Sequence, residues 1–99
     1  MTILVVNISQ TIGNMPIQQA ATQAWKLNHE RAQECDYLVA VTEGEPRAFF
    51  KVQEATEFAH EPRRVEFIID RFCNRNEILT ITEKLFNKNL SGFVTRYIE

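Results

Sequence analysis

The sequence predicts an α+β fold, in which a small bent mixed β-sheet or β-barrel is flanked by two or three short helices. Two patterns support this prediction. Short stretches of β-branched and aliphatic residues recur along the chain, as is typical of strands. Apolar residues between the first two stretches recur at helical spacing, which indicates a helix with one buried face. Strands with helices packed on one side of a mixed sheet belong to the α+β class.

The N-terminal part is expected to form one strand and one helix. Thr2 to Ile8 is rich in β-branched and aliphatic residues and predicts a buried strand. A polar loop over residues 9–14 follows, and Pro16 suits the first turn of the helix. The apolar face of this helix is predicted to consist of Ile17, Ala20, Ala21, Ala24 and Trp25.

The next segment is expected to form a second short helix and a hairpin. Asn28 is a favourable N-cap for a helix from His29 to Cys35. Tyr37 to Thr42 is a nearly continuous apolar run and predicts a strand that is covered on both faces. Gly44 can adopt a positive φ in a turn, so residues 37–52 are predicted to form a β-hairpin.

The C-terminal half is expected to add two strands. They are predicted at Arg64–Ile69, where apolar and polar residues alternate, and at Phe93–Ile98. Residues 53–63 and 70–76 are interpreted as connecting loops. Residues 80–86 fit a short helix and a strand equally well.

Length and composition limit the class of protein. The 99 residues fit one domain that spans residues 1–99. Hydrophobic residues make up 44% and charged residues 24%, which is an ordinary globular composition and argues against disorder. The formal net charge of −2 disfavours both a generally basic nucleic-acid coat protein and a strongly acidic DNA mimic. A small basic face is compatible with this near-neutral total.

The cysteines and the N-terminus bear on the compartment. Cys35 and Cys73 lie far apart and outside any C-x-x-C motif, so we expect two reduced, half-buried thiols. The N-terminal apolar run lacks a basic region and is too short for a signal peptide or a membrane span. We therefore expect a cytoplasmic protein with no membrane partner.

The usual motifs of catalysis and metal binding are absent from the sequence. It holds no H-E-x-x-H, EF-hand or P-loop pattern, and His29 and His60 lie far apart, so we expect no metal and no cofactor. Ser9 and Ser91 lie outside any G-x-S-x-G elbow, and we predict no catalytic residue. The sequence therefore favours a protein without enzymatic activity. A small hydrolase or nuclease stays open as an alternative, because folding can bring acidic residues together.

Aromatic residues beside basic and amide side chains are the strongest chemical signal. A flat ring can stack on a base, a Lys or Arg can hold a phosphate, and an Asn can read a base edge. On this basis the ligand-binding residues are predicted to be Trp25, Lys26, Asn28, Arg31, Tyr37 and Arg96. The alternative, in which Trp25 fills the core and its basic neighbours are solvated, stays open. Arg63 and Arg64 are interpreted as solvated surface rather than as part of a site.

Several short motifs together resemble a known superfamily. The motifs are Trp25-Lys26-x-Asn28-x-x-Arg31-Ala32, Asp36-Tyr37-x-x-Ala40-Val41, Gly44, Phe49-Phe50-Lys51-Val52, Arg64-Val65-Glu66-Phe67 and Arg96-Tyr97-Ile98. Their arrangement resembles that of small PUA-like domains, the superfamily that includes the EVE, ASCH and YTH modules. The resemblance implies a strongly bent β-barrel flanked by helices, which binds RNA, or DNA with modified bases, and has no catalytic activity. It also implies a pocket at the seam between helix and barrel, near Trp25.

Three functional hypotheses follow. The first is a module that binds nucleic acid or a nucleotide and reads a modified base in a pocket. The second is an interaction protein from a phage or another mobile element that inhibits or adapts a host factor. Its binding patch would be formed by Phe58, Phe72 and Phe86 on exposed loops. The third is the small hydrolase or nuclease, which needs two carboxylates and a base in one cleft.

Overall fold

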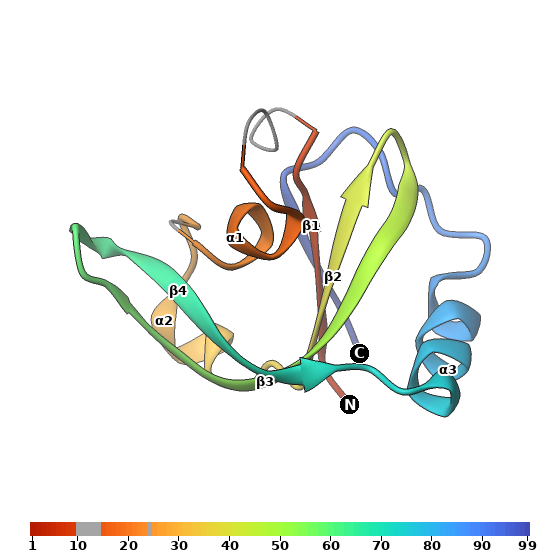
Figure 1. The fold of residues 1–99 in the computed structure, drawn as a ribbon. Coiled ribbons are helices and arrows are strands. Elements are labelled where there is room, and N and C mark those ends of the chain that lie inside the picture. Colours follow the sequence, from red (N-terminus) through yellow and green to blue (C-terminus); the bar gives the residue numbers. More distant parts are fainter. Residues whose placement is uncertain (10–14, 24) are drawn as a thin grey trace.

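The computed structural model describes residues 1–9, 15–23 and 25–99, without the side chain of Pro62. Its elements are β1 (Ile3–Asn7), α1 (Ile17–Thr22), α2 (His29–Ala32), β2 (Tyr37–Thr42), β3 (Glu45–Phe58), β4 (Glu61–Phe72), α3 (Arg75–Leu85) and β5 (Thr95–Ile98). They form a five-stranded mixed sheet with short helices packed against it (Figure 1), which confirms the predicted α+β class. Of the two predicted forms, the structure has the open sheet. The predicted loop residues 10–14 and the predicted helix residue Ala24 lie outside the described residues.

The strands follow the order β4-β3-β2-β1-β5 across the sheet. β1 and β2 pair in parallel, with Leu4 opposite Leu38, and the other neighbouring strands are antiparallel. α1 and α2 form the crossover between β1 and β2, because a tight turn cannot join parallel neighbours. β4 and β5 are the two edges of the sheet, and the candidate site described below draws residues from both.

The sheet separates two hydrophobic clusters. On one face, Leu4 of β1 and Leu38 of β2 pack in a cluster with Trp25. On the other face, Val39 of β2 packs in a cluster with Ile81 of α3. Because both faces are covered, β1 and β2 are apolar at nearly every position, as the sequence predicted for the second of them. Helices on both faces correct the predicted layering, which placed them on one side only.

Glu43 and Gly44 form the two-residue turn between β2 and β3, with φ values of 52° and 78°. Positive φ at both positions is typical of the type I′ turn, which matches the twist of a hairpin. A Cβ added at Gly44 would meet Ser91 at 3.9 Å, so the backbone angle rather than lack of space favours glycine here. The predicted hairpin over residues 37–52 is confirmed.

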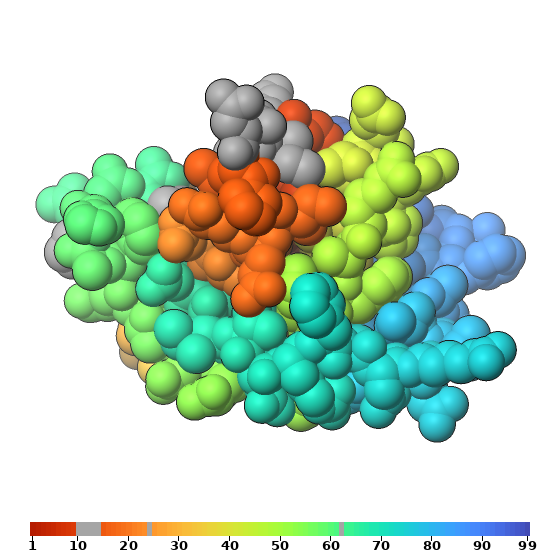
Figure 2. All heavy atoms as spheres, in the orientation of Figure 1, coloured from red at the N-terminus to blue at the C-terminus, as the bar shows by residue number. Residues whose placement is uncertain are grey.

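β3 and β4 extend well beyond the strands predicted up to Val52 and over Arg64–Ile69, and they form a long hairpin that bends into an arm beside the rest of the sheet (Figure 1). Figure 2 shows α1 (orange) between this arm (green to turquoise) and the β2–β3 turn (yellow-green). The predictions of loops over residues 53–63 and 70–76 are wrong, because strand structure occupies most of the first segment, and β4 ends and α3 begins within the second. Register shifts near Val52, Glu54 and Phe58 break the two-residue alternation on which a strand prediction depends.

The first two helices are shorter than predicted. α1 ends at Thr22, and Trp25 has extended backbone instead of helical backbone. The N–H of Trp25 donates to the Val65 carbonyl at 3.0 Å, and the N–H of Val65 donates to the Trp25 carbonyl at 2.8 Å. This pairing with the outer edge of β4 overrides the helical spacing of the sequence. α2 ends at Ala32 rather than at Cys35.

α3 resolves the ambiguity over residues 80–86, most of which form its C-terminal half. A capping box starts the helix: the Glu77 N–H donates to Asn74 Oδ1 at 2.9 Å, and the Asn74 N–H donates to Glu77 Oε1 at 2.8 Å. The sequence carries this Asn-x-x-Glu signature, although the prediction placed residue 74 in a loop. α3 has 11 residues, and none of the helices in the described ranges is long and apolar enough to cross a membrane.

Candidate ligand-binding groove

Two adjoining cavities lie beside the tip of the β3–β4 hairpin. The first has a volume of about 650 Å³ and is lined by Met15, Gln19, Ala20, Gln23, Trp25, Lys26, Phe58, Arg64, Val94 and Thr95. The second has a volume of about 490 Å³ and is lined by Lys26, His60, Glu61, Arg63 and Arg64. Lys26 and Arg64 line both cavities, so we treat the two as one site and call it the groove.

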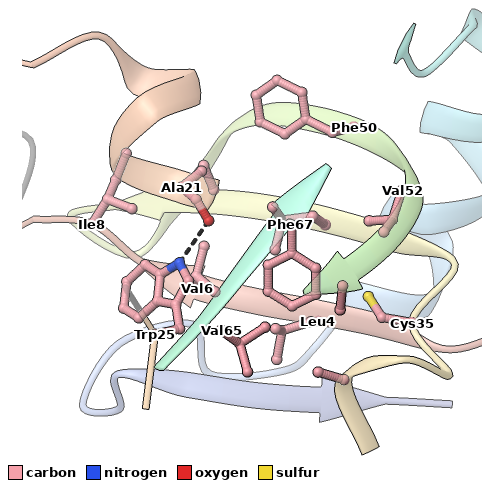
Figure 3. Close-up of a cluster of buried hydrophobic side chains, with 14 of the residues drawn as sticks. Leu4, Val6, Ile8, Ala21, Trp25, Cys35, Phe50, Val52, Val65 and Phe67 are labelled. Carbon is pink, nitrogen blue, oxygen red and sulfur yellow. Dashed lines mark hydrogen bonds between the residues drawn. The ribbon is translucent and has the colours of Figure 1, made fainter. Parts of the chain in front are cut away.

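Trp25 forms part of the wall of the first cavity and is also a core residue. Its side chain is only 6% exposed and packs among Val6, Val65 and other members of the cluster on this face of the sheet. The indole Nε1–H donates to the Ala21 carbonyl at 2.6 Å (Figure 3). The ring therefore has a satisfied polar end and a mostly buried surface. The core interpretation of Trp25 is confirmed, and the residue contributes a small area of its ring to the groove.

The remaining apolar wall of the first cavity is accessible. Met15 and Val94 are 41% and 65% exposed, and both line this cavity. Phe58 is half-buried, and its ring contacts the ring of His60 edge-on, with the ring centres 5.5 Å apart. Met15 lies just before α1, Val94 lies just before β5, and Phe58 is the last residue of β3. Three separate parts of the chain therefore present apolar surface to one cavity. Concave apolar surface of this kind is typical of a small-molecule site.

The second cavity is cationic. Lys26 and Arg63 are exposed, and Arg64 Nε lies 3.2 Å from the Glu61 carboxylate. Three cationic side chains thus surround a cavity to which the described residues contribute a single carboxylate. Clustered cations in a hollow favour binding of an anion, even on a protein whose net charge is negative. Arg63 is exposed, as predicted, but the sequence does not reveal this cavity, because the pairing of Trp25 with Val65 that sets Lys26 beside Arg64 joins residues far apart in the chain.

Asn28 and Arg31 serve the structure of α2 and its neighbours. Asn28 Oδ1 accepts the Arg31 N–H at 2.9 Å, which confirms the predicted N-cap. The Arg31 guanidinium forms ion pairs with Glu34 and with Glu99, and it lies over the Tyr97 ring at 4.6 Å from the ring centre. The two carboxylates raise the pKa of Arg31 through hydrogen bonds. Neither Asn28 nor Arg31 lines the groove.

Tyr37 and Arg96 also lie outside the groove. Tyr37 packs on the α3 side of the sheet, which is the face opposite to Trp25. Its hydroxyl donates to Glu77 at 2.8 Å, and this hydrogen bond is the main reason that the pKa of Tyr37 is raised. Arg96 is exposed on β5, with a guanidinium nitrogen 3.4 Å from the Asn89 carbonyl. The structure therefore brings only Trp25 and Lys26 of the six predicted residues together.

The cysteines and the acidic residues supply no reactive arrangement in the described part of the chain. Cys35 and Cys73 are both free and buried, and burial raises their pKa values to about 12 and about 11. Both thiols are thus protonated at neutral pH and are poor nucleophiles. No three His, Cys, Asp or Glu side chains of the described residues gather as a metal site needs. Glu61 is the one carboxylate among the described residues of the groove, and it pairs with Arg64.

The phenylalanines predicted to form an interaction patch lie apart. Phe58 ends β3 at the tip of the hairpin and lines the groove. Phe72 lies at the other end of the hairpin, where its ring contacts Phe50 at 5.1 Å between ring centres, and it is 64% exposed. Phe86 follows α3 and is 75% exposed.

Comparisons of the chain with models of protein families, with curated proteins and with solved structures gave no match, so the resemblance to PUA-like domains stays a prediction.

Proposed function

We propose that the protein binds nucleic acid or a nucleotide in the groove. One observation supports this proposal above the others: an apolar cavity walled by Trp25 and Phe58 joins a cationic cavity through the shared Lys26 and Arg64. A nucleotide has the same two parts, because a flat base with apolar faces is joined to an anionic phosphate. Stacking of a base on an aromatic side chain contributes about 1–3 kcal/mol, and Lys or Arg supplies the phosphate contacts.

The resemblance to PUA-like domains adds a modified base to this proposal. The position of Trp25, between α1 and the edge of β4, agrees with a pocket at the seam of helix and sheet. A cytoplasmic location belongs to the same proposal. It is supported by the free thiols of Cys35 and Cys73, because disulfides rarely form in reducing compartments.

The experiment is a titration that follows the fluorescence of Trp25, the only tryptophan of the chain. The ligands are short single-stranded RNA and single-stranded DNA with plain or modified bases, each at two salt concentrations. We expect a change in emission that weakens as salt rises, since phosphate contacts release counterions. The R63A variant should bind more weakly, and K88A should bind as the native protein does, because Lys88 follows α3 and lies outside both cavities. Because Trp25 is mostly buried, the anisotropy of labelled oligonucleotides is measured in parallel, and no change in either signal with any ligand would reject the proposal.

A second candidate is a protein-binding role. In this case the protein would come from a phage or another mobile element and would bind a host factor. It is favoured by three exposed apolar side chains, with Phe72 at 64%, Leu79 at 55% and Phe86 at 75% exposure. The test compares capture of a partner by the native protein, by F72S/F86S and by R63A. A partner that the double variant loses and R63A keeps would support this candidate, and equal capture by all three would reject it.

A further inference from the structure

We infer that the groove recognises one nucleotide unit by dividing it, with the base in the first cavity and its own phosphate in the second. The smallest complete ligand is then a nucleoside monophosphate, either free or as one unit of a single strand. This inference rests on the proposed function and adds a footprint and a division of labour to it. It predicts what each wall of the groove contributes to binding.

The first cavity has the surface that a base needs. Phe58 and Val94 present apolar side chains, and Gln19 and Gln23 line the same cavity, Gln19 from α1 and Gln23 from the residue directly after it. An amide offers both a donor and an acceptor, which is what the edge of a base requires.

The edge of β5 adds backbone groups to this cavity. The Asn7 N–H donates to the Val94 carbonyl at 2.8 Å, so these two residues form a hydrogen-bonded pair of the antiparallel ladder between β1 and β5. The next pair, Val6 with Thr95, is then a non-bonded pair, and the N–H and C=O of Thr95 point away from β1. β5 is an edge strand, and Thr95 lines the first cavity. Thr95 therefore places a main-chain donor and acceptor at the outer edge of the sheet, next to the cavity that it lines.

The second cavity has the charge that a phosphate needs. Lys26, Arg63 and Arg64 are cationic, and Glu61 offsets one charge through its ion pair with Arg64. The cavity therefore attracts a phosphate through more than one cation, and charge-assisted hydrogen bonds are the stronger kind. Arg63 lines only the second cavity, whereas Lys26 and Arg64 line both cavities and lie where the two meet. A phosphate held at that boundary lies next to the cavity proposed for the base, as the two parts of one nucleotide require.

The experiment measures binding by calorimetry for adenosine, cytidine, guanosine and uridine, for their 5′-monophosphates and for inorganic phosphate. Single-stranded oligonucleotides are titrated in parallel. F58A changes only the first cavity, R63A changes only the second, and K88A is the control outside both. Q23A is a second variant of the first cavity in case F58A loosens the hairpin, and thermal unfolding checks that each variant is folded.

We expect at least one monophosphate to bind about tenfold more tightly than its nucleoside and than inorganic phosphate. R63A should reduce the preference for the monophosphate and leave the affinity for the nucleoside unchanged. F58A or Q23A should weaken both the nucleoside and the monophosphate, and K88A should change neither. This pattern would assign the base to the first cavity and the phosphate to the second.

Three results would overturn the inference. Equal affinity for nucleoside and monophosphate would show that the second cavity does not bind the phosphate. Equal affinity for monophosphate and inorganic phosphate would show that the first cavity does not bind the base. Oligonucleotides that bind while all four monophosphates fail would reject the one-nucleotide footprint and leave the proposed function standing. Failure of the oligonucleotides and the monophosphates together would reject both.

Discussion

The Arg71 guanidinium donates two hydrogen bonds to the Glu77 carboxylate, at 2.6 and 3.1 Å, and thereby joins the end of β4 to the first turn of α3. The same carboxylate accepts the Tyr37 hydroxyl at 2.8 Å and the Asn74 N–H at 2.8 Å. Glu77 thus ties the helix to two strands, and its side chain is only 15% exposed. α3 supplies one of the two layers that cover the sheet, so this carboxylate has a leading part in holding that layer in place.

The network around Glu77 predicts a loss of stability in acid. The hydrogen bonds from Arg71, followed by the Asn74 N–H, lower the pKa of Glu77 from 4.5 to about 2. The folded state therefore favours the ionised carboxylate, and its contribution to stability is present above pH 4.5 and is lost as pH falls toward 2. Urea unfolding at a series of pH values should show this loss in the native protein and much less of it in E77Q. E83Q, on an exposed position of the same helix, is the control, and equal acid sensitivity of E77Q and the native protein would contradict the prediction.

Trp25 is predicted to contribute more to the stability of the fold than to the binding of a ligand. W25F removes the donor to the buried Ala21 carbonyl, at a cost of about 1–3 kcal/mol in the free energy of unfolding. W25A also leaves a cavity in the core and should cost about 3–5 kcal/mol. Chemical denaturation followed by circular dichroism measures both variants. A loss below about 0.5 kcal/mol for W25A would show that the core does not depend on this side chain.

The capping box of α3 predicts a second, smaller effect. N74A removes the oxygen that accepts the Glu77 N–H and should lower the free energy of unfolding by about 1 kcal/mol. N76A is the matched control, because Asn76 is an exposed asparagine of the same helix and only its backbone carbonyl accepts a described hydrogen bond, from Thr80. Urea titration distinguishes the two variants. If N76A proved as costly as N74A, the loss of stability could not be assigned to the cap.

The cations of the groove predict the salt dependence of binding. One phosphate held in the second cavity gives a slope of about −0.7 for log K of a single strand against log salt, and loss of a cation from that cavity reduces its magnitude. R63A should show this reduction for any oligonucleotide that binds. R31A should leave the slope unchanged, because Arg31 is paired with Glu34 and Glu99 outside the groove. A slope that falls in R31A and persists in R63A would place the strand along α2 instead.

Local chemistry in the sequence was enough to predict several elements. The apolar run Tyr37–Thr42, the turn at Gly44 and the cap at Asn28 all depend on residues close together in the chain, and all three predictions are confirmed. The long hairpin was missed because its bulges shift the alternation of inward and outward residues. The end of α1 was missed because Trp25 pairs with Val65, a partner 40 positions further along the chain that no local pattern reveals.

The candidate site shows the same division. Trp25 and Lys26 are neighbours in the chain, so the sequence could place them together. Alternation along a strand shows which residues share a face but does not show which face a helix will cover, and Tyr37, predicted to bind the ligand together with Trp25, lies on the opposite face of the sheet. Arg63 meets Lys26 only through the pairing of Trp25 with Val65, which is a property of the folded chain.

The position of β1 in the sheet affects how the chain folds during synthesis. β1 leaves the ribosome before the other four strands, yet one of its two neighbours, β5, is the last strand to be made. Until Thr95–Ile98 emerges, one side of an apolar strand has no partner and can pair with another nascent chain. Translation pauses or truncations that fall after α3 should therefore favour aggregation, because the first strand depends on the last one to close its open side.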